Sequence, residues 1–302
     1  MRPLQSCSPA LTPTLPPVGG GRPNGLGGPN GCIDFTFTGN GGLQDVVGNL
    51  TALYASGGFS SLLSKADFFV LAGNAAVRVA SMLPPGATPQ GGLPMPDAPL
   101  RLPFRYGRVD DASCDGVDGA FLPSTNLSYG GIAAIFCTRV GMTPRQLVAI
   151  MGAHTLGRAE ASDSGGFDGG WSGFSSSFSI MYYWQLLAVP WNAKDAPLPG
   201  EWLAPPPLPG APSDPMLINL KSPDVEMVIT PSDACPFFNE LNFTQPTPAP
   251  QPGTACPVNA KNVAALTTFT TNQTAWWEAF AGAWQVMTEY SYAGQLQPVA
   301  GW

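Results

Sequence analysis

The stretch Gln146-Leu147-Val148-Ala149-Ile150-Met151-Gly152-Ala153-His154-Thr155-Leu156-Gly157-Arg158 carries the only histidine in a chain of 302 residues. Its sequence predicts a helix, because Thr143, Pro144 and Gln146 are typical of an N-cap, a first-turn proline and the third-position partner of a capping box. Gly157 is a natural stop for that helix. Chemistry that needs an imidazole must therefore take place near the end of this helix.

The position of His154 within the helix leaves two interpretations open. Leu147, Ile150, Met151 and His154 recur at helical spacing, which predicts that the imidazole lies on the apolar face and points into the protein. A buried histidine needs a hydrogen-bond partner for each ring nitrogen. It is then either a core histidine bonded to a backbone carbonyl or a metal ligand.

The composition predicts a folded chain that acts on small molecules. Hydrophobic residues make up 44% of it, enough for a large core, whereas only 11% are charged and the formal net charge is −7. Such a chain offers no basic surface for a phosphate backbone, so we expect no nucleic-acid partner. We also expect no membrane span, because no apolar run reaches the roughly 18 residues required.

Cysteines and glycosylation sequons favour a secreted glycoprotein with disulfides. The six cysteines are too widely spaced for a C-x-x-C metal site, and their even number is compatible with three disulfides. They are Cys7, Cys32, Cys114, Cys137, Cys235 and Cys256. Sequons begin at Asn49, Asn126, Asn242 and Asn272. The first residues, however, contain no apolar core of a signal peptide, so the compartment stays open.

The chain consists of expected helices separated by loops rich in proline and glycine. Residues 1–31 are dominated by Pro, Gly and Ser, which predicts a disordered N-terminal segment. Residues 82–108 and 189–216 are expected to be irregular. Helices are expected at 43–54 with Asn40 as a cap, and at 60–80, 131–140, 178–187 and 274–290. No strand with clean alternation stands out, which predicts a mainly α fold.

Several segments together resemble one known family. Gln146 to Leu156 is an apolar helix that ends in Gly-Ala-His-Thr-Leu, Ser164 to Trp171 is a glycine-rich turn that ends in tryptophan, and an aromatic helix begins at Phe178. In this order they are similar to the proximal haem-ligand signature and following elements of the plant, fungal and bacterial haem peroxidase superfamily. Further segments that resemble the family are Asn40-Gly41-Gly42-Leu43, Tyr106-Gly107-Arg108-Val109-Asp110 and Pro231-Ser232-Asp233.

The resemblance implies a mainly α, two-lobed haem-peroxidase-like fold with long Pro/Gly-rich loops. Residues 32–302 would form the peroxidase domain, with an incomplete distal lobe at about 32–130 and a proximal lobe at about 131–302. The implied cofactor is haem b, with His154 as the axial ligand of the iron. Asp233 would be the carboxylate bonded to the other imidazole nitrogen, although a helix N-cap is the alternative for this residue.

Two further residues receive a role from the resemblance. Trp171 would pack beneath the haem, as in the ascorbate and cytochrome c peroxidase branch, or else anchor the glycine turn. Cysteines and sequons favour the secreted branches instead, so the branch stays open. Asn40 corresponds to the residue that orients the distal imidazole in the family. The family's proximal cation site is altered, with Phe174 and Ser179 at expected ligand positions, and we expect no tightly bound cation.

The implied function is the reduction of hydrogen peroxide with one-electron oxidation of a small organic donor, a reaction typical of the response to oxidative stress. In the family a distal histidine, with an arginine one helical turn before it, cleaves the peroxide. Counting back from Asn40 places that histidine near residue 10, where Pro9 and Pro13 forbid a helix interior. Either the sequence begins inside a longer one or this is a variant that has abandoned peroxide cleavage. We therefore expect impaired turnover, or alternatively a non-catalytic scaffold with or without haem.

Overall fold

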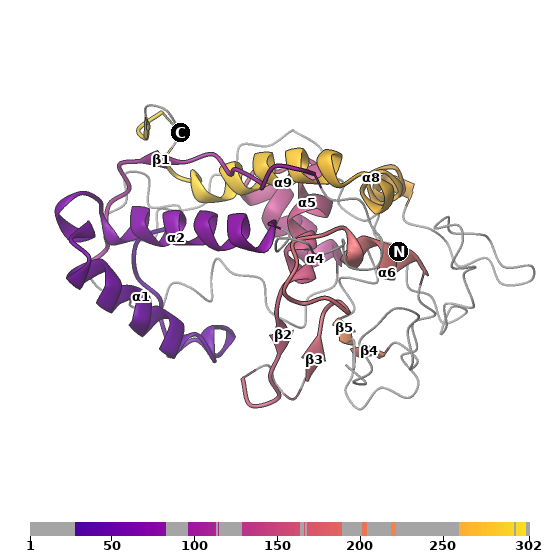
Figure 1. The fold of residues 1–302 in the computed structure, drawn as a ribbon, viewed down its shortest axis with the longest axis horizontal. Coiled ribbons are helices and arrows are strands. Elements are labelled where there is room, and N and C mark those ends of the chain that lie inside the picture. The colour runs from indigo at the N-terminus through magenta and orange to yellow at the C-terminus, as the bar shows by residue number, and fades with distance from the viewer. Residues whose placement is uncertain are drawn as a thin grey trace, which may run out of the picture.

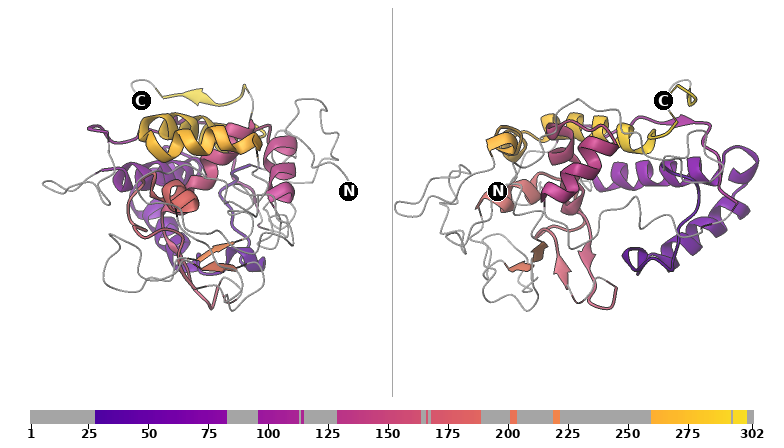
Figure 2. Two further views of the ribbon diagram at one scale, coloured as in Figure 1. Left: turned by 90° about the vertical axis from the view of Figure 1, so that its right-hand side faces the viewer. Right: turned by 180° about the vertical axis from the view of Figure 1, so that it is seen from behind.

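The fold of this chain is mainly α, as the sequence predicts (Figure 1). The computed structural model describes residues 28–82, 96–112, 114, 129–163, 166, 168–188, 201–203, 219–221, 260–292 and 294–299. Two groups of helices, one within residues 44–80 and one within residues 129–288, lie side by side, and the helix of residues 273–288 reaches the first group (Figures 1 and 2). The predicted division into a distal and a proximal lobe stays a prediction.

The first group contains helices α1 (Gln44–Ser56) and α2 (Lys65–Ala80). Both were predicted, but their starts differ from the prediction. Residue Leu43, not Asn40, is the N-cap of α1, and it makes no side-chain capping bond. Helix α2 begins later than expected because Ser64 caps it, its hydroxyl accepting the N–H of Asp67 at 3.0 Å. Two 3-10 turns, Thr38–Asn40 and Phe59–Ser61, precede these helices.

Aromatic rings hold α1 against α2. The ring of Tyr54 on α1 lies 5.4 Å from that of Phe68 on α2, and Phe59 lies 4.9 Å from the same ring. The Tyr54 hydroxyl donates to the carbonyl of Leu63 at 2.8 Å. Burial together with the nearby Asp110 carboxylate raises the pKa of Tyr54, so the hydroxyl keeps its proton at neutral pH.

The second group is built around α5 (Pro144–Met151), in which every residue from Leu147 to Met151 is buried. Helices α8 and α9 pack on α5, and α6 packs on α8 (Figure 1). The bounds of the other helices are α4 (Tyr129–Ala133), α6 (Met181–Ala188), α8 (Ala260–Thr271) and α9 (Gln273–Thr288). A π-helical turn, Ala134–Arg139, continues α4, so the predicted helix at 131–140 is confirmed in place but not in regularity.

Helix α8 was not predicted from the sequence. Four of its last five residues are threonines, which are poor helix formers because their branched side chains lose rotamer freedom. In the structure, Thr268 and Thr270 donate their hydroxyls to the carbonyls four residues earlier, each at 2.7 Å. Leu266 and Phe269 are buried in the core. Tertiary packing therefore outweighs local propensity in α8.

Strands within the described residues are short and form antiparallel pairs. The pairs are β1 (Arg105–Tyr106) with β6 (Gln297–Pro298), β2 (Arg158–Ala159) with β3 (Gly169–Gly170), and β4 (Glu201–Leu203) with β5 (Asn219–Lys221). Strand β4 lies within residues 189–216 and strand β1 within residues 82–108, so the expectation of irregular structure is wrong for these two strands. The β2–β3 hairpin matters most here, because it follows the helix that leads to His154.

Residues 29–32 are linked to distant parts of the chain by a disulfide and by hydrogen bonds. Cys32 is disulfide-bonded to Cys114, and Cys137 is in a disulfide as well, which confirms the predicted disulfide chemistry. Asn30 donates to Asp111 at 2.6 Å, and the Tyr292 hydroxyl donates to the carbonyl of residue 29 at 2.9 Å. Residues 1–27 lie outside the described part of the chain. None of the helices described is both long and apolar enough to cross a membrane.

A buried ion pair joins the two groups of helices. Arg108 Nη1 lies 2.7 Å from Asp67 Oδ1, and the two side chains are only 1% and 2% exposed. Asp67 also accepts the N–H of Gly107 at 2.7 Å, and Arg108 Nε donates to the carbonyl of Thr288 at the end of α9 at 2.9 Å. These extra hydrogen bonds compensate the desolvation of both charges. The ion pair thereby connects α2 of the first group to α9 of the second.

Removing one member of this ion pair should be costly. Arg108→Met leaves the Asp67 carboxylate buried without its counter-charge, and we expect the free energy of unfolding to fall by about 3–5 kcal/mol. Urea denaturation followed by circular dichroism measures this. The control is Arg105→Met, because the Arg105 side chain is 44% exposed and lies 3.7 Å from Glu289. Equal losses for the two variants would contradict the assigned role of the buried pair.

Candidate active site

The start of α5 confirms the capping box predicted from the sequence. Thr143 Oγ1 accepts the N–H of Gln146 at 3.2 Å, and Gln146 Oε1 accepts the N–H of Thr143 at 2.9 Å. Pro144 occupies the first turn. Two of the otherwise unpaired amides at this helix end are thus satisfied by local residues. The start of the helix that leads to His154 is therefore fixed by local sequence.

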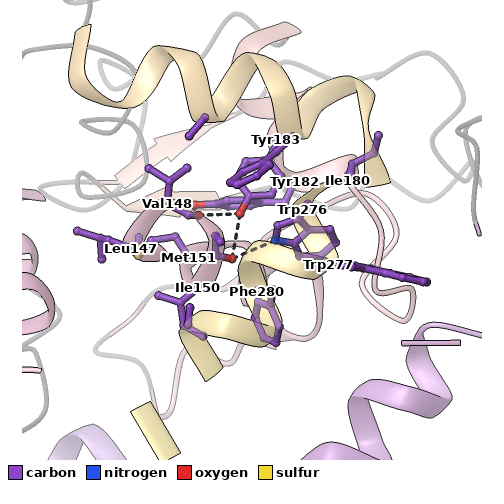
Figure 3. Close-up of a cluster of buried hydrophobic side chains, with 14 of the residues drawn as sticks. Leu147, Val148, Ile150, Met151, Ile180, Tyr182, Tyr183, Trp276, Trp277 and Phe280 are labelled. Carbon is purple, nitrogen blue, oxygen red and sulfur yellow. Dashed lines mark hydrogen bonds between the residues drawn. The ribbon is translucent and has the colours of Figure 1, made fainter. Parts of the chain in front are cut away.

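The end of the same helix differs from the prediction. Helix α5 stops at Met151, and Gly152–Thr155 form a 3-10 turn, so His154 does not lie in an α-helix. Two side chains from other helices reach the last carbonyls. Tyr183 Oη donates to the carbonyl of Val148 at 2.6 Å, and Trp276 Nε1 donates to that of Ala149 at 3.0 Å (Figure 3).

Gly152 provides the room for these two donors. A Cβ built on Gly152 would collide with Tyr183 Oη and would lie 2.7 Å from Trp276 Nε1. Burial raises the pKa of the Tyr183 hydroxyl well above its ordinary value, and hydrogen bonds from the Gly152 backbone and from Trp276 offset this only in part. The hydroxyl therefore stays protonated and continues to donate at neutral pH.

The imidazole of His154 stacks on the indole of Trp171. The ring centroids are 4.7 Å apart and the planes are inclined by 14°. Tyr182 approaches edge-on, with its centroid 5.9 Å from the imidazole and an angle of 78°. His154 itself is half-buried, less enclosed than the apolar spacing predicted. The two rings restrict the imidazole to a small range of orientations.

The chain after His154 folds back so that Trp171 can reach it. Gly157 has a φ of +77°, which glycine adopts without strain, and its N–H donates to the carbonyl of Ser175 at 2.8 Å. The β2–β3 hairpin then returns the chain. Ser172, next to Trp171, donates its hydroxyl to the carbonyl of Thr155 at 2.9 Å. This bond fixes the residue after Trp171 to the residue after His154.

The hydroxyl groups of Thr155 and Ser172, the residues that follow His154 and Trp171, both take part in hydrogen bonds. Thr155 Oγ1 donates to the carbonyl of Ser177 at 3.2 Å, and Ser172 Oγ donates as described. Among the described residues, no group of three or more His, Cys, Asp or Glu side chains could hold a metal ion. The expected lack of a tightly bound cation stays a prediction.

Comparison with known families matches residues 33–234 to the family described as "Peroxidase". The chain belongs to the peroxidase family. The match spans most of the described helices and includes the helix that leads to His154 and the hairpin that leads to Trp171. It confirms the family resemblance inferred from the sequence.

Relatives of this peroxidase-family chain include enzymes named after different electron donors. It is 38% identical over 94 residues to the mitochondrial cytochrome c peroxidase of Emericella nidulans, covering 31% of the chain and 25% of the relative. It is 32% identical over 165 residues to the peroxisomal L-ascorbate peroxidase 5 of Arabidopsis thaliana, covering 53% and 50%. A "Putative heme-binding peroxidase" of Cryptococcus neoformans is 31% identical over 155 residues, covering 51% and 42%. The chain thus matches between a quarter and a half of the length of these relatives.

Of the other predicted site residues of this peroxidase-family chain, Asn40 and Asp233, the structure describes only Asn40. Asn40 is buried four residues before α1, and its Nδ2 donates to the carbonyl of Asp34 at 2.9 Å. The adjoining segment meets the β2–β3 hairpin, because Gly42 lies against the carboxylate of Asp163. Asp233 lies outside the described residues, and its pairing with His154 stays a prediction. The structure therefore brings together His154 and Trp171.

Sequence reasoning missed the residues that shape the end of α5. Tyr183 belonged to the predicted aromatic helix, but nothing in its local pattern marked its hydroxyl as a donor to α5. The helix predicted at 274–290 contains Trp276, which is fully buried, but sequence reasoning assigned this residue no role at α5. A signal existed in the spacing, since residues 276 and 280 lie one helical turn apart.

Gly152→Ala tests whether this crowded helix end has room for another atom. The added methyl group would overlap the Tyr183 hydroxyl, and we expect a loss of about 1–3 kcal/mol in the free energy of unfolding through overpacking. Gly48→Ala is the matched control, because Gly48 lies inside α1 and a Cβ there meets nothing within 4 Å. That control should be neutral or stabilising through helix propensity. Urea midpoints that fall equally in both variants would show that Gly152 has no special packing role.

Proposed function

We propose that this chain binds haem b through His154 and reduces hydrogen peroxide at the expense of a small organic one-electron donor. The observation that carries the proposal is the stacked His154–Trp171 pair at the end of a buried helix in a peroxidase-family chain. Family membership supports haem as the cofactor, and the printed name of the Cryptococcus relative agrees with it. We further propose that residues of about 32–130 and 131–302 supply the two lobes on either side of the haem.

The donor set at His154 fits haem better than a bare ion. A site for a bare transition metal needs three or more protein ligands, whereas a porphyrin brings four nitrogens and leaves only axial positions for the protein. One imidazole is such an axial donor set. The half-buried position of His154 at the edge of the core suits a ligand that faces a large planar group. Haem, when bound, supplies the redox chemistry of peroxide reduction.

The residues around His154 would orient the imidazole. Trp171 covers one ring face and Tyr182 approaches from its edge, so the direction of the nitrogen atoms is restricted. The Ser172 hydroxyl keeps the tryptophan segment attached to Thr155. We propose Asp233 as the carboxylate that accepts a hydrogen bond from the second imidazole nitrogen, which would make His154 a more basic ligand.

Proton transfer to and from peroxide needs another group. The chain has one histidine, and if its imidazole holds the haem it would not also serve as the acid–base catalyst for peroxide. General acid–base catalysis contributes about 10²- to 10⁴-fold to a rate. We therefore expect this polypeptide by itself to reduce peroxide more slowly, by roughly that factor, than a peroxidase that has such a catalyst. The single histidine also favours the alternative function, a non-catalytic haem-binding or haem-free scaffold of the peroxidase fold.

Hemin titration tests the ligand assignment. We expect wild-type protein to give a Soret band typical of an imidazole-ligated haem, and His154→Ala to bind hemin at least about tenfold more weakly with an altered band, because the axial ligand is lost. Absorption spectroscopy and tryptophan quenching measure both. His154→Ala must keep the wild-type far-UV circular dichroism spectrum. Identical hemin spectra and affinities for the two proteins would refute the assignment.

Guaiacol oxidation under peroxide separates the enzyme from the scaffold. A peroxidase should oxidise guaiacol faster than the same concentration of free hemin, and His154→Ala should reduce the rate to that of free hemin. A loaded wild-type protein that is no faster than free hemin would exclude the enzymatic function of this chain and support the scaffold. The two experiments are independent, because haem binding is measured without turnover.

A further inference from the structure

We propose that Tyr183 and Trp276 are positioning residues that direct His154 by changing the pitch of its helix. Both residues bond to the backbone of α5 and would act through it (Figure 3). The relevance of this inference to haem rests on the proposed function. The geometry itself involves only protein groups and can be tested separately.

The first step of the inference follows the carbonyl groups at the end of α5. In a continuing α-helix, the carbonyl of Val148 would accept the N–H of Gly152. Here the Gly152 N–H turns to the carbonyl of Ala149, three residues earlier. The Tyr183 hydroxyl donates to the Val148 carbonyl at 2.6 Å, and its oxygen lies where a Cβ on Gly152 would be. The hydroxyl thus gives the Val148 carbonyl the donor that the Gly152 N–H would supply in a continuing α-helix.

The second step concerns Ala149. Its carbonyl accepts the indole N–H of Trp276 at 3.0 Å and lies 3.0 Å from Tyr183 Oη as well. Both aromatic side chains are fully buried. A buried carbonyl left without a donor costs about 1–3 kcal/mol, and the Ala149 carbonyl has the Gly152 N–H as a further donor. The two side chains therefore stabilise a helix end that would be unfavourable in this apolar core, and they come from α6 and α9.

The third step relates the helix end to the direction of the imidazole. A 3-10 helix turns by about 120° and rises about 2.0 Å per residue, against about 100° and 1.5 Å in an α-helix. Over the three steps from Met151 to His154, the imidazole is rotated by roughly 60° and advanced by roughly 1.5 Å. This rotation moves it away from the apolar face shared by Leu147 and Ile150. It is then placed where it stacks on Trp171.

Helix α6 links the positioning residues to the imidazole directly. Tyr183 bonds to the end of α5, while the adjacent Tyr182 presents its edge to His154. The Tyr183 and Trp276 rings also contact each other at 5.5 Å. A side chain that inserts into the hydrogen-bond ladder of a helix is a recognised cause of local distortion. The same rigid cluster therefore sets both the turn and the environment of the imidazole.

The test uses the fact that His154 is the only histidine, so its Cε1–H gives a single NMR cross-peak in the metal-free protein. In Tyr183→Phe and Trp276→Phe we expect this cross-peak to move and its NOE to the Trp171 indole to weaken. Hemin affinity should fall by roughly tenfold, as for other residues that orient a metal ligand.

Two matched controls separate positioning from a general loss of packing. Tyr54→Phe removes a hydroxyl that also donates to a backbone carbonyl, that of Leu63, far from α5. Trp277→Phe removes a buried indole whose N–H bonds to the carbonyl of Phe178 instead of α5. Both controls should leave the His154 cross-peak, its NOE and the hemin affinity unchanged. Should Tyr183→Phe lose the wild-type circular dichroism spectrum, Trp276→Phe provides the same test.

The outcomes distinguish this inference from the proposed function. A His154 cross-peak and hemin affinity that are the same in Tyr183→Phe, Trp276→Phe and wild type would overturn the positioning role, even if hemin binds through His154. A cross-peak that moves equally in the controls would overturn it as well. If wild type and His154→Ala bind hemin alike, the proposed function fails, while the cross-peak of the metal-free protein still decides the positioning role.

Discussion

The structure depends on a helix whose C-terminal end is buried. Helix α5 lies in the core with every residue from Leu147 to Met151 enclosed, so water cannot hydrate the carbonyls of its last turn. Those carbonyls must find donors within the protein. Tyr183 of α6 and Trp276 of α9 provide them, which requires both helices to place these side chains at the same turn of α5. The arrangement of the second group of helices follows from this requirement more directly than from apolar contact, which is not directional.

Helix α9 carries this constraint to the other group of helices. Trp276 bonds to the end of α5, and Trp284, eight residues later on the same helix, donates its indole N–H to Asn74 Oδ1 of α2 at 2.7 Å. The carbonyl of Thr288, at the end of α9, accepts from Arg108 of the buried ion pair. One helix thus contacts the site, α2 and the ion pair in succession. Because these bonds are buried and directional, a change at either end of α9 is resisted by the other.

Sequence reasoning succeeded where the cause is local. The capping box of α5 involves two residues three positions apart, and the structure confirms it. The aromatic helix α9 follows from the spacing of its large side chains. The 3-10 turn at His154 could not be predicted in this way, because its donors lie about 30 and 120 residues away in the chain and an α-helical pattern continues through the turn. Helix α8 was missed because tertiary packing outweighs the preferences of its threonines. Asn40 does not cap α1, because its side-chain amide bonds to the carbonyl of Asp34 six residues earlier.

The orientation of His154 results from this mixture of local and distant causes. The capping box fixes where α5 begins, and the distant donors fix where it ends, so the position of residue 154 along the helix axis is set from both sides. The β2–β3 hairpin then supplies Trp171, which limits the rotation of the imidazole about its own side-chain bonds. Each contact joins one protein group to another. The ordering of the imidazole is therefore coupled to folding of the core. Because the imidazole is already ordered, binding a ligand to it costs less conformational entropy.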